Sequence, residues 1–149
     1  MLASQKTLYA LRAVFELAKR RGQGPVKAAQ IAAAQAIPQR FLEVILAQLK
    51  GAALVWSRRG SAGGYILART PDSISIGEVV YLIQGPVGPV HCLETNPKDA
   101  CPLRGHCAFM SMWQDVQQAI NNVFSSTTFA VLVARDEQQR QQYVPSYAI

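Results

Sequence analysis

Residues 37–67 read IPQRFLEVILAQLKGAALVWSRRGSAGGYIL, and this stretch decides the fold. Pro38 fits a first helical turn, and the apolar residues that follow recur at helical spacing as far as about Lys50. They are expected to face inward (Phe41, Leu42, Ile45, Leu46 and Leu49). Gly51 is the expected left-handed residue that stops this helix. Two short apolar runs, 54–57 and 65–68, then flank a glycine-rich turn and predict a β-hairpin.

Two further helices are expected upstream, over residues 4–20 and 26–34. The second of these, the break at 35–37 and the helix from Pro38 have the order of a helix-turn-helix. In that motif the last helix enters the major groove of DNA with its first turns. Gln39, Arg40 and Glu43 are therefore candidates for contacts with bases.

The hairpin turn opens with two arginines, Arg58 and Arg59. A basic hairpin directly after a helix-turn-helix makes a winged helix, whose wing would place the arginines against phosphates or in a minor groove. A plain hairpin with solvated arginines is the alternative. The fold class predicted is mainly α with a small β-hairpin wing, as a winged helix-turn-helix domain joined to a long dimerisation helix.

The charge is divided unevenly along the 149 residues. Residues 1–70 hold eleven Lys and Arg against two acids, Glu16 and Glu43, for a net charge of +9. Residues 71–149 hold four basic and seven acidic residues, a net charge of −3. This division favours a head that binds a polyanion and a separate regulatory or assembly part. Ordinary solubility charge is the alternative.

All three cysteines lie in one predicted loop, residues 92–107, with the spacing C-x₈-C-x₅-C. Proline, asparagine and glycine in this segment disfavour helix and strand. Thiolates are ligands for zinc, Cu(I) or iron–sulfur clusters. The loop is therefore a candidate metal or redox centre.

A long amphipathic helix is expected from about 107 to 125. Its apolar stripe, either core or a dimer seam, comprises Phe109, Met112, Trp113, Val116, Ile120, Val123 and Phe124. A short helix over 129–135 and a polar, loose tail would follow. We divide the chain into a DNA-binding head (1–70), a regulatory and dimerisation part (71–134) and the tail (135–149).

In this order the elements resemble those of the Rrf-type transcriptional regulators, the IscR, NsrR and RirA group, over roughly residues 1–134. The resemblance is carried by Tyr9–Ala13 (YALRA), Ile37–Glu43 (IPQRFLE), Leu54–Gly60 (LVWSRRG), Gly63–Tyr65 (GGY), and three cysteines before a helix containing Trp113. The combination is far more specific than any one of its pieces.

The resemblance implies a homodimeric, sequence-specific DNA-binding regulator, expected to be a repressor, on a partly palindromic operator in double-stranded DNA. It implies DNA contacts from the third helix and the wing (Gln39, Arg40, Glu43, Arg58, Arg59 and Gly60). It further implies an iron–sulfur cluster, [2Fe–2S] or [4Fe–4S], held by Cys92, Cys101 and Cys107. That cluster would change DNA affinity with redox state, nitric oxide or iron supply.

The fourth cluster ligand stays open, because the histidine that IscR places three residues after its last cysteine is Met110 here, and the acid that some relatives place in the first helix is Leu8. The candidates are a partner ligand, a small molecule, or His91, His106, Glu94 and Asp99. A disulfide switch, or zinc held by the cysteines and a histidine, remains the alternative to a cluster.

Other classes of protein fit less well. No run of about 18 apolar residues predicts a transmembrane helix, and the N-terminus lacks the apolar core of a signal peptide. Three cysteines without such a signal favour a reducing cytoplasm. A cysteine nucleophile assisted by His91 or His106 would need a third orienting group and a substrate pocket, which the sequence does not indicate, so we expect no enzyme.

Overall fold

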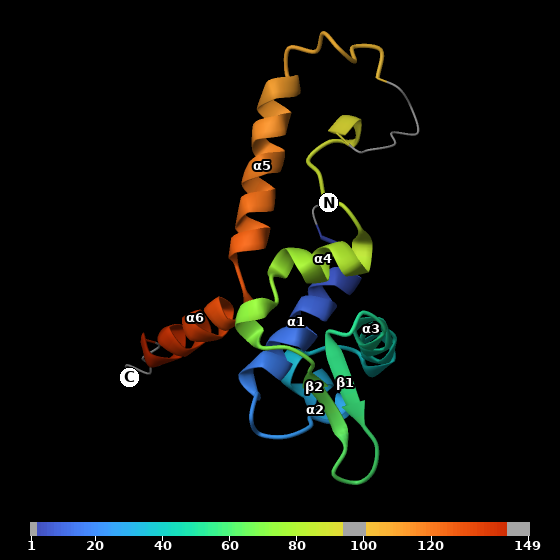
Figure 1. Cartoon of the computed structure of the whole chain (residues 1–149), viewed down its shortest axis with the longest axis vertical. Coiled ribbons are helices and arrows are strands. Elements are labelled where there is room, and N and C mark those ends of the chain that lie inside the picture. The colour runs from blue at the N-terminus through green and yellow to red at the C-terminus, as the bar shows by residue number, and fades with distance from the viewer. Residues whose placement is uncertain (1–2, 94–100, 143–149) are drawn as a thin grey trace, which may run out of the picture.

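The computed structural model describes residues 3–93 and 101–142. These residues form helices α1 (Gln5–Lys19), α2 (Ala28–Gln35), α3 (Gln39–Gly51), α4 (Ile76–Gln84), α5 (Met110–Ser126) and α6 (Phe129–Gln142), strands β1 (Val55–Arg58) and β2 (Gly64–Leu67), and 3-10 turns η1 (Pro71–Ser73) and η2 (His91–Leu93). Helices α1–α4, the two strands and α6 make up a head, and α5 with residues 101–109 projects from it as an arm (Figure 1). The mainly helical fold with one β-hairpin is confirmed.

The apolar face of α3 supplies the centre of the head. Its side chains at Leu42, Ile45, Leu46 and Leu49 are fully buried, as the sequence predicts. The prediction that Phe41 faces inward is wrong, because its side chain is 43% exposed on the flank of the helix. Phe41 instead meets Tyr9 of α1, with ring centroids 6.1 Å apart.

The turn between α2 and α3 confirms the order of a helix-turn-helix. Ala36 ends α2 in the left-handed region at φ 51°, Ile37 is 4% exposed, and Pro38 is the N-cap of α3. Gly51, the expected left-handed stop, is instead the last residue of α3. The left-handed conformation falls on Ala53, at φ 56°.

The wing is a two-stranded antiparallel sheet in which Trp56 pairs with Ile66 and Arg58 with Gly64. Its base is fixed to the head by two backbone hydrogen bonds between Val26 and Tyr65, of 2.9 and 2.8 Å. A Cβ at Gly64 would lie 2.5 Å from the carbonyl oxygen of Val26, so only glycine permits this approach. The backbone therefore holds the orientation of the wing.

The core of the head extends beyond residue 70. Phe129, the first residue of α6, is completely buried and belongs to the same cluster as Ile74, Val79 and the residues of α1 and α3. Backbone hydrogen bonds from Phe129 to Ile74 (3.1 Å) and from Ile76 to Thr127 (2.9 Å) join the segments before α4 and α6.

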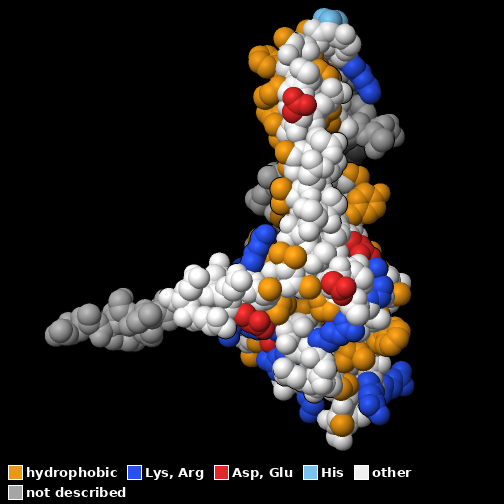
Figure 2. Space-filling view, turned by 60° about the vertical axis from the view of Figure 1, so that its left-hand side comes forward, with side chains coloured by type: hydrophobic (Ala, Val, Ile, Leu, Met, Phe, Trp, Pro, Cys, Tyr) orange, Lys and Arg blue, Asp and Glu red, His pale blue; other side chains and the backbone are white. Residues whose placement is uncertain are grey.

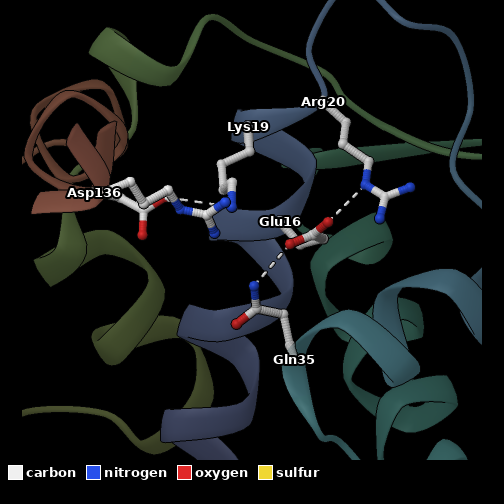
Figure 3. Close-up of polar contacts among 6 residues, drawn as sticks. Glu16, Lys19, Arg20, Gln35 and Asp136 are labelled. Atoms are coloured by element: carbon white, nitrogen blue, oxygen red, sulfur yellow. Dashed lines mark hydrogen bonds and ion pairs between the residues drawn. The ribbon is translucent and has the colours of Figure 1, made fainter. Parts of the chain in front are cut away.

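Helix α6 continues through residues 136–142, where the sequence predicts a loose tail. That prediction is wrong for these residues, and positions 143–149 lie outside the described residues. Asp136 anchors the helix: its Oδ2 lies 3.3 Å from Nζ of Lys19 on α1 and 3.0 Å from Nε of Arg140 (Figure 3). Among the described residues, no helix is long and apolar enough to cross a membrane.

Candidate DNA-binding surface and cysteine loop

The first turns of α3 present three polar side chains to solvent. Gln39, Arg40 and Glu43 are all exposed, whereas the opposite face of the helix is buried. Nε2 of Gln39 donates a hydrogen bond to Oε1 of Glu43 at 3.3 Å. The guanidinium carbon of Arg40 lies 4.9 Å from the ring centroid of Phe41, within the range of a cation–π contact. The exposed Phe41 thus supports the side chain of Arg40.

The tip of the wing is basic and closely folded. Arg58, Arg59 and Gly60 are exposed, and Gly60 has a φ of 102°, which L residues rarely adopt. A Cβ at Gly63 would lie 2.2 Å from the carbonyl oxygen of Arg58, so this turn requires glycine there too. The two arginines are therefore held at the end of a short, well-defined hairpin.

Charge separates the head from the arm. In Figure 2 the Lys and Arg side chains gather on the head, while hydrophobic side chains run along one edge of the arm. Most of the basic residues fall within residues 1–70, where the net charge is +9. A positive head with an exposed helix start and a basic wing is suited to the phosphate backbone and grooves of DNA.

The described residues 101–107 of the cysteine loop lie at the far end of the arm (Figure 1). Cys92 is in η2, and Cys101 and Cys107 precede α5. All three thiols are free and partly exposed, so they are open to oxidation or to a metal. Glu94 and Asp99, two of the candidate fourth ligands, lie outside the described residues.

The structure does not bring the three cysteines together as a metal site. Within residues 3–93 and 101–142, no three His, Cys, Asp or Glu side chains are grouped as metal ligands. Leu93, next to Cys92, shares a cavity of about 500 Å³ with Gln117 and α4. Gln117 lies about two helical turns, roughly 10 Å, along α5 from its first residue, Met110. The chain therefore enters the loop well away from the helix end at which Cys107 leaves it.

Helix α5 has no buried residue along its whole described length. The apolar stripe expected from the sequence is present but only partly covered: Phe109 (65%), Met112 (42%) and Val123 (60%) are exposed, whereas Trp113, Val116, Ile120 and Phe124 are half-buried. The C-terminal end of α5 meets the head, where Phe124 packs against Gly77 of α4, and Nε2 of Gln117 donates a hydrogen bond to the carbonyl oxygen of Val87 at 2.7 Å. The stripe therefore contributes little to the core of a single chain.

Glu16, close to the helix-turn-helix, carries a buried charge that the sequence did not predict. Glu16 of α1 is 4% exposed, with Arg20 and Gln35 as its partners. The spacing of Glu16 and Arg20, four residues apart in a helix, was the one signal of a pair. Nothing in the sequence indicates that the pair is covered or that Gln35 joins it.

A comparison with protein families gives one match of nearly full length. Residues 3–135 match Rrf2, described as an iron-dependent transcriptional regulator. The chain belongs to the Rrf2 family.

Curated relatives in the Rrf2 family align over most of this chain. The transcriptional regulator CymR of Bacillus subtilis is 33% identical over 144 residues, covering 97% of this chain and 98% of CymR. The regulator IscR of Sodalis glossinidius is 32% identical over 137 residues, covering 92% and 81% of the two chains. This protein is therefore a DNA-binding transcriptional regulator and not an enzyme.

Solved structures of Rrf2 regulators have the same fold. The structure of B. subtilis CymR, described as the global cysteine regulator, has a TM-score of 0.75 at 32% identity and covers 91% of this chain and 98% of CymR. IscR of T. potens has a TM-score of 0.74 at 31% identity, covering 99% and 95%. The oxidized form of Staphylococcus aureus CymR has a TM-score of 0.70 at 28% identity, covering 98% and 100%.

Proposed function

We propose that this Rrf2 regulator represses transcription by reading a partly palindromic operator with α3 and the wing. In this proposal the bases are contacted by Gln39, Arg40 and Glu43 of α3. The sugar–phosphate backbone of the DNA is contacted by Arg58, Arg59 and Gly60 of the wing. The observation that carries this proposal is that all six residues are exposed on one positively charged head, into whose core α3 packs only its opposite, apolar face. Charged and amide side chains at the start of a recognition helix are those that distinguish base edges.

The second element of the proposal is a homodimer formed through α5. The stripe on α5 supports it: none of its residues is buried and three are exposed, whereas an amphipathic helix normally buries its apolar face against a partner. Two copies related by a twofold axis would present two α3 helices to two half-sites. A partly palindromic operator follows from that symmetry.

The third element is control of DNA affinity at the cysteine loop by an iron–sulfur cluster, [2Fe–2S] or [4Fe–4S], held by Cys92, Cys101 and Cys107. Its support is the donor type, the partly exposed thiols and the iron-dependent description of the family. A cluster supplies a centre that changes charge with redox state. The described residues do not group these thiols, so the cluster would have to draw η2 and residues 101–107 together.

A thiol switch is the second candidate, and the likeness to CymR favours it. One CymR structure is of an oxidized form, and the thiols here are free and partly exposed. Under oxidation two cysteines would form a disulfide and leave the third as a thiol. Zinc held by the three cysteines and a histidine is a further alternative to the cluster, and it would leave the protein colourless.

The DNA-reading element is tested by selecting duplexes from a random pool with the full-length protein. An enriched sequence should bind about a thousandfold more tightly than a scrambled duplex, at the lower end for specific regulators. A pool without enrichment contradicts the proposal.

The control element is tested by the visible spectrum, iron content and acid-labile sulfide of protein purified without oxygen. Broad bands with matching iron and sulfide support the cluster. Colourless, sulfide-free protein after attempted reconstitution excludes it, and thiol titration and zinc analysis then separate the two remaining candidates.

A further inference from the structure

The carboxylate of Glu16 is a buried charge and is not among the side chains proposed to contact DNA. It lies on α1 and is 4% exposed. Carboxylates are rarely covered to this extent unless each oxygen has a partner, because removal from water is costly. The identity of those partners indicates what the charge does.

Each oxygen of Glu16 has its own donor (Figure 3). Nε of Arg20 donates to Oε1 at 2.6 Å, within α1. Nε2 of Gln35 donates to Oε2 at 2.7 Å, from the last residue of α2. The second bond therefore joins α1 to the residue immediately before the helix-turn-helix turn.

That turn has little side-chain support of its own. Ala36 occupies the left-handed region without the freedom of glycine, and Pro38 caps α3 without a side-chain hydrogen bond. Ile37 is buried, but apolar burial is non-directional and fixes depth better than angle. A hydrogen bond to a carboxylate is short and directional. The bond from Gln35 to Glu16 is thus suited to fixing the angle at which the chain enters α3.

We propose that Glu16 is a positioning residue for DNA reading: through Gln35 it fixes the end of α2 and so aims the first turn of α3 at the base edges. The inference rests on the proposed reading of DNA by α3, and adds a residue that does not touch DNA itself. The wing does not depend on this contact, because its base is held by the backbone of Val26 and Tyr65. Loss of Glu16 should therefore impair sequence reading more than phosphate binding.

The substitution Glu16→Gln separates these effects. The new amide has one oxygen acceptor, so it can satisfy Arg20 or Gln35 but not both, and its NH₂ group faces the other donor. With the full-length dimer and the duplex selected by the wild type, we expect the ratio of selected to scrambled affinity to fall about tenfold, the size of one mismatched base pair. Affinity for the scrambled duplex should change less than about twofold, because the phosphate contacts remain. Both are measured by fluorescence anisotropy well below the unfolding midpoint of every variant.

Asp136→Asn is the matched control. It makes the same chemical change at a second buried carboxylate oxygen beside α1, whose ion-pair partners are Lys19 of α1 and Arg140 of α6. The ratio of selected to scrambled affinity should be the same in Asp136→Asn as in the wild type, even if the variant is less stable. An equal loss of ratio in Asp136→Asn would overturn the proposal, since the effect would then be general destabilisation.

Two further variants keep the test decisive if Glu16→Gln folds poorly. Gln35→Ala removes the amide but leaves Glu16 paired with Arg20, and should lower the ratio about as much as Glu16→Gln. Combining Glu16→Gln with Gln35→Glu restores an amide–carboxylate pair and should recover most of the ratio. If Gln35→Ala folds and keeps the wild-type ratio of selected to scrambled affinity, the inference about Glu16 is overturned but the proposed function is not. If the wild type selects no sequence at all, the proposed function itself is overturned.

Discussion

The head and the arm differ in how far they bury their apolar side chains. In the head, α1, α3, the segment before α4 and the start of α6 share one covered core. In the arm, α5 spans 17 residues without one that is buried, and Phe109 and Val123 are more exposed than not. One chain therefore contains a part that completes its own packing and a part that does not.

The difference shows where each kind of function can be built. A packed head can hold α3 and the wing in fixed positions, as recognition of base edges requires. An uncovered arm responds to a partner or to a ligand at its tip, because little internal packing opposes a change. Each of the following substitutions tests this contrast.

Leu46→Ala should have the largest effect. Leu46 is fully buried in α3, so its loss leaves a cavity and lowers the free energy of unfolding by about 2–5 kcal/mol. Urea unfolding followed by circular dichroism measures the change at fixed protein concentration. Val44→Ala, on the same helix but 54% exposed, should change stability by no more than about 0.5 kcal/mol. Equal losses in the two variants would mean that the head is not packed as described.

Val123→Asp should come next. A charge at Val123, near the C-terminal end of the proposed dimer stripe, raises the dissociation constant of the dimer at least about tenfold, or 1.4 kcal/mol. Sedimentation velocity across a concentration series gives that constant. Asn122→Asp adds the same charge one residue away on the polar face and should leave the dimer intact. If Val123→Asp remained as dimeric as the wild type, the arm would have some other role.

Arg59→Ala should have a smaller effect, confined to DNA binding. Loss of one phosphate contact reduces the slope of log affinity against log salt by about 0.9. Titrations of the selected duplex at several salt concentrations measure the slope. Arg135→Ala removes an exposed charge from α6 and should leave the slope unchanged. Identical slopes for Arg59→Ala and the wild type would exclude the wing from the interface.

Cys101→Ser should affect stability least. Cys101 is partly exposed in the arm, so the unfolding free energy of the head should move by less than about 0.5 kcal/mol. Under the cluster proposal, the same variant loses bound iron and sulfide when purified without oxygen. Iron content equal to that of the wild type would remove Cys101 from the ligand set. A large fall in stability would show that the arm supports the head after all.

The helix-turn-helix and the wing could be predicted because their signals are local. Pro38 marks a helix start, and the glycines at 60, 63 and 64 mark a tight hairpin, whatever surrounds them. The buried face of α3 also followed from spacing alone, with Phe41 as the exception. Phe41 lies at the edge of that face, where the neighbouring helix, rather than periodicity, decides exposure.

The remaining differences depend on contacts between distant residues. Residues 136–142 are polar and looked like a tail, but Glu, Gln and Arg favour helix and Asp136 is tied to Lys19. The burial of Glu16 could not be predicted, because its partner Gln35 is nineteen residues away in the sequence. For the cysteine loop, the sequence gives the chemical type of the proposed ligands but not their arrangement in space. The spacing of the cysteines does not determine where η2 lies relative to α5.

Because the chain is synthesised from its N-terminus, Phe129 reaches the core later than the other buried residues of the same cluster. Phe129 packs into the same core as Ile74, and a ribosome adding roughly 5–20 residues per second needs roughly 3–11 s to add the 55 residues that follow Ile74 up to Phe129. During that interval the nascent helix-turn-helix has an open core, which chaperones can recognise. A truncated product ending before α6 would keep that opening permanently. The core of the head is therefore complete only after the start of α6 has been synthesised.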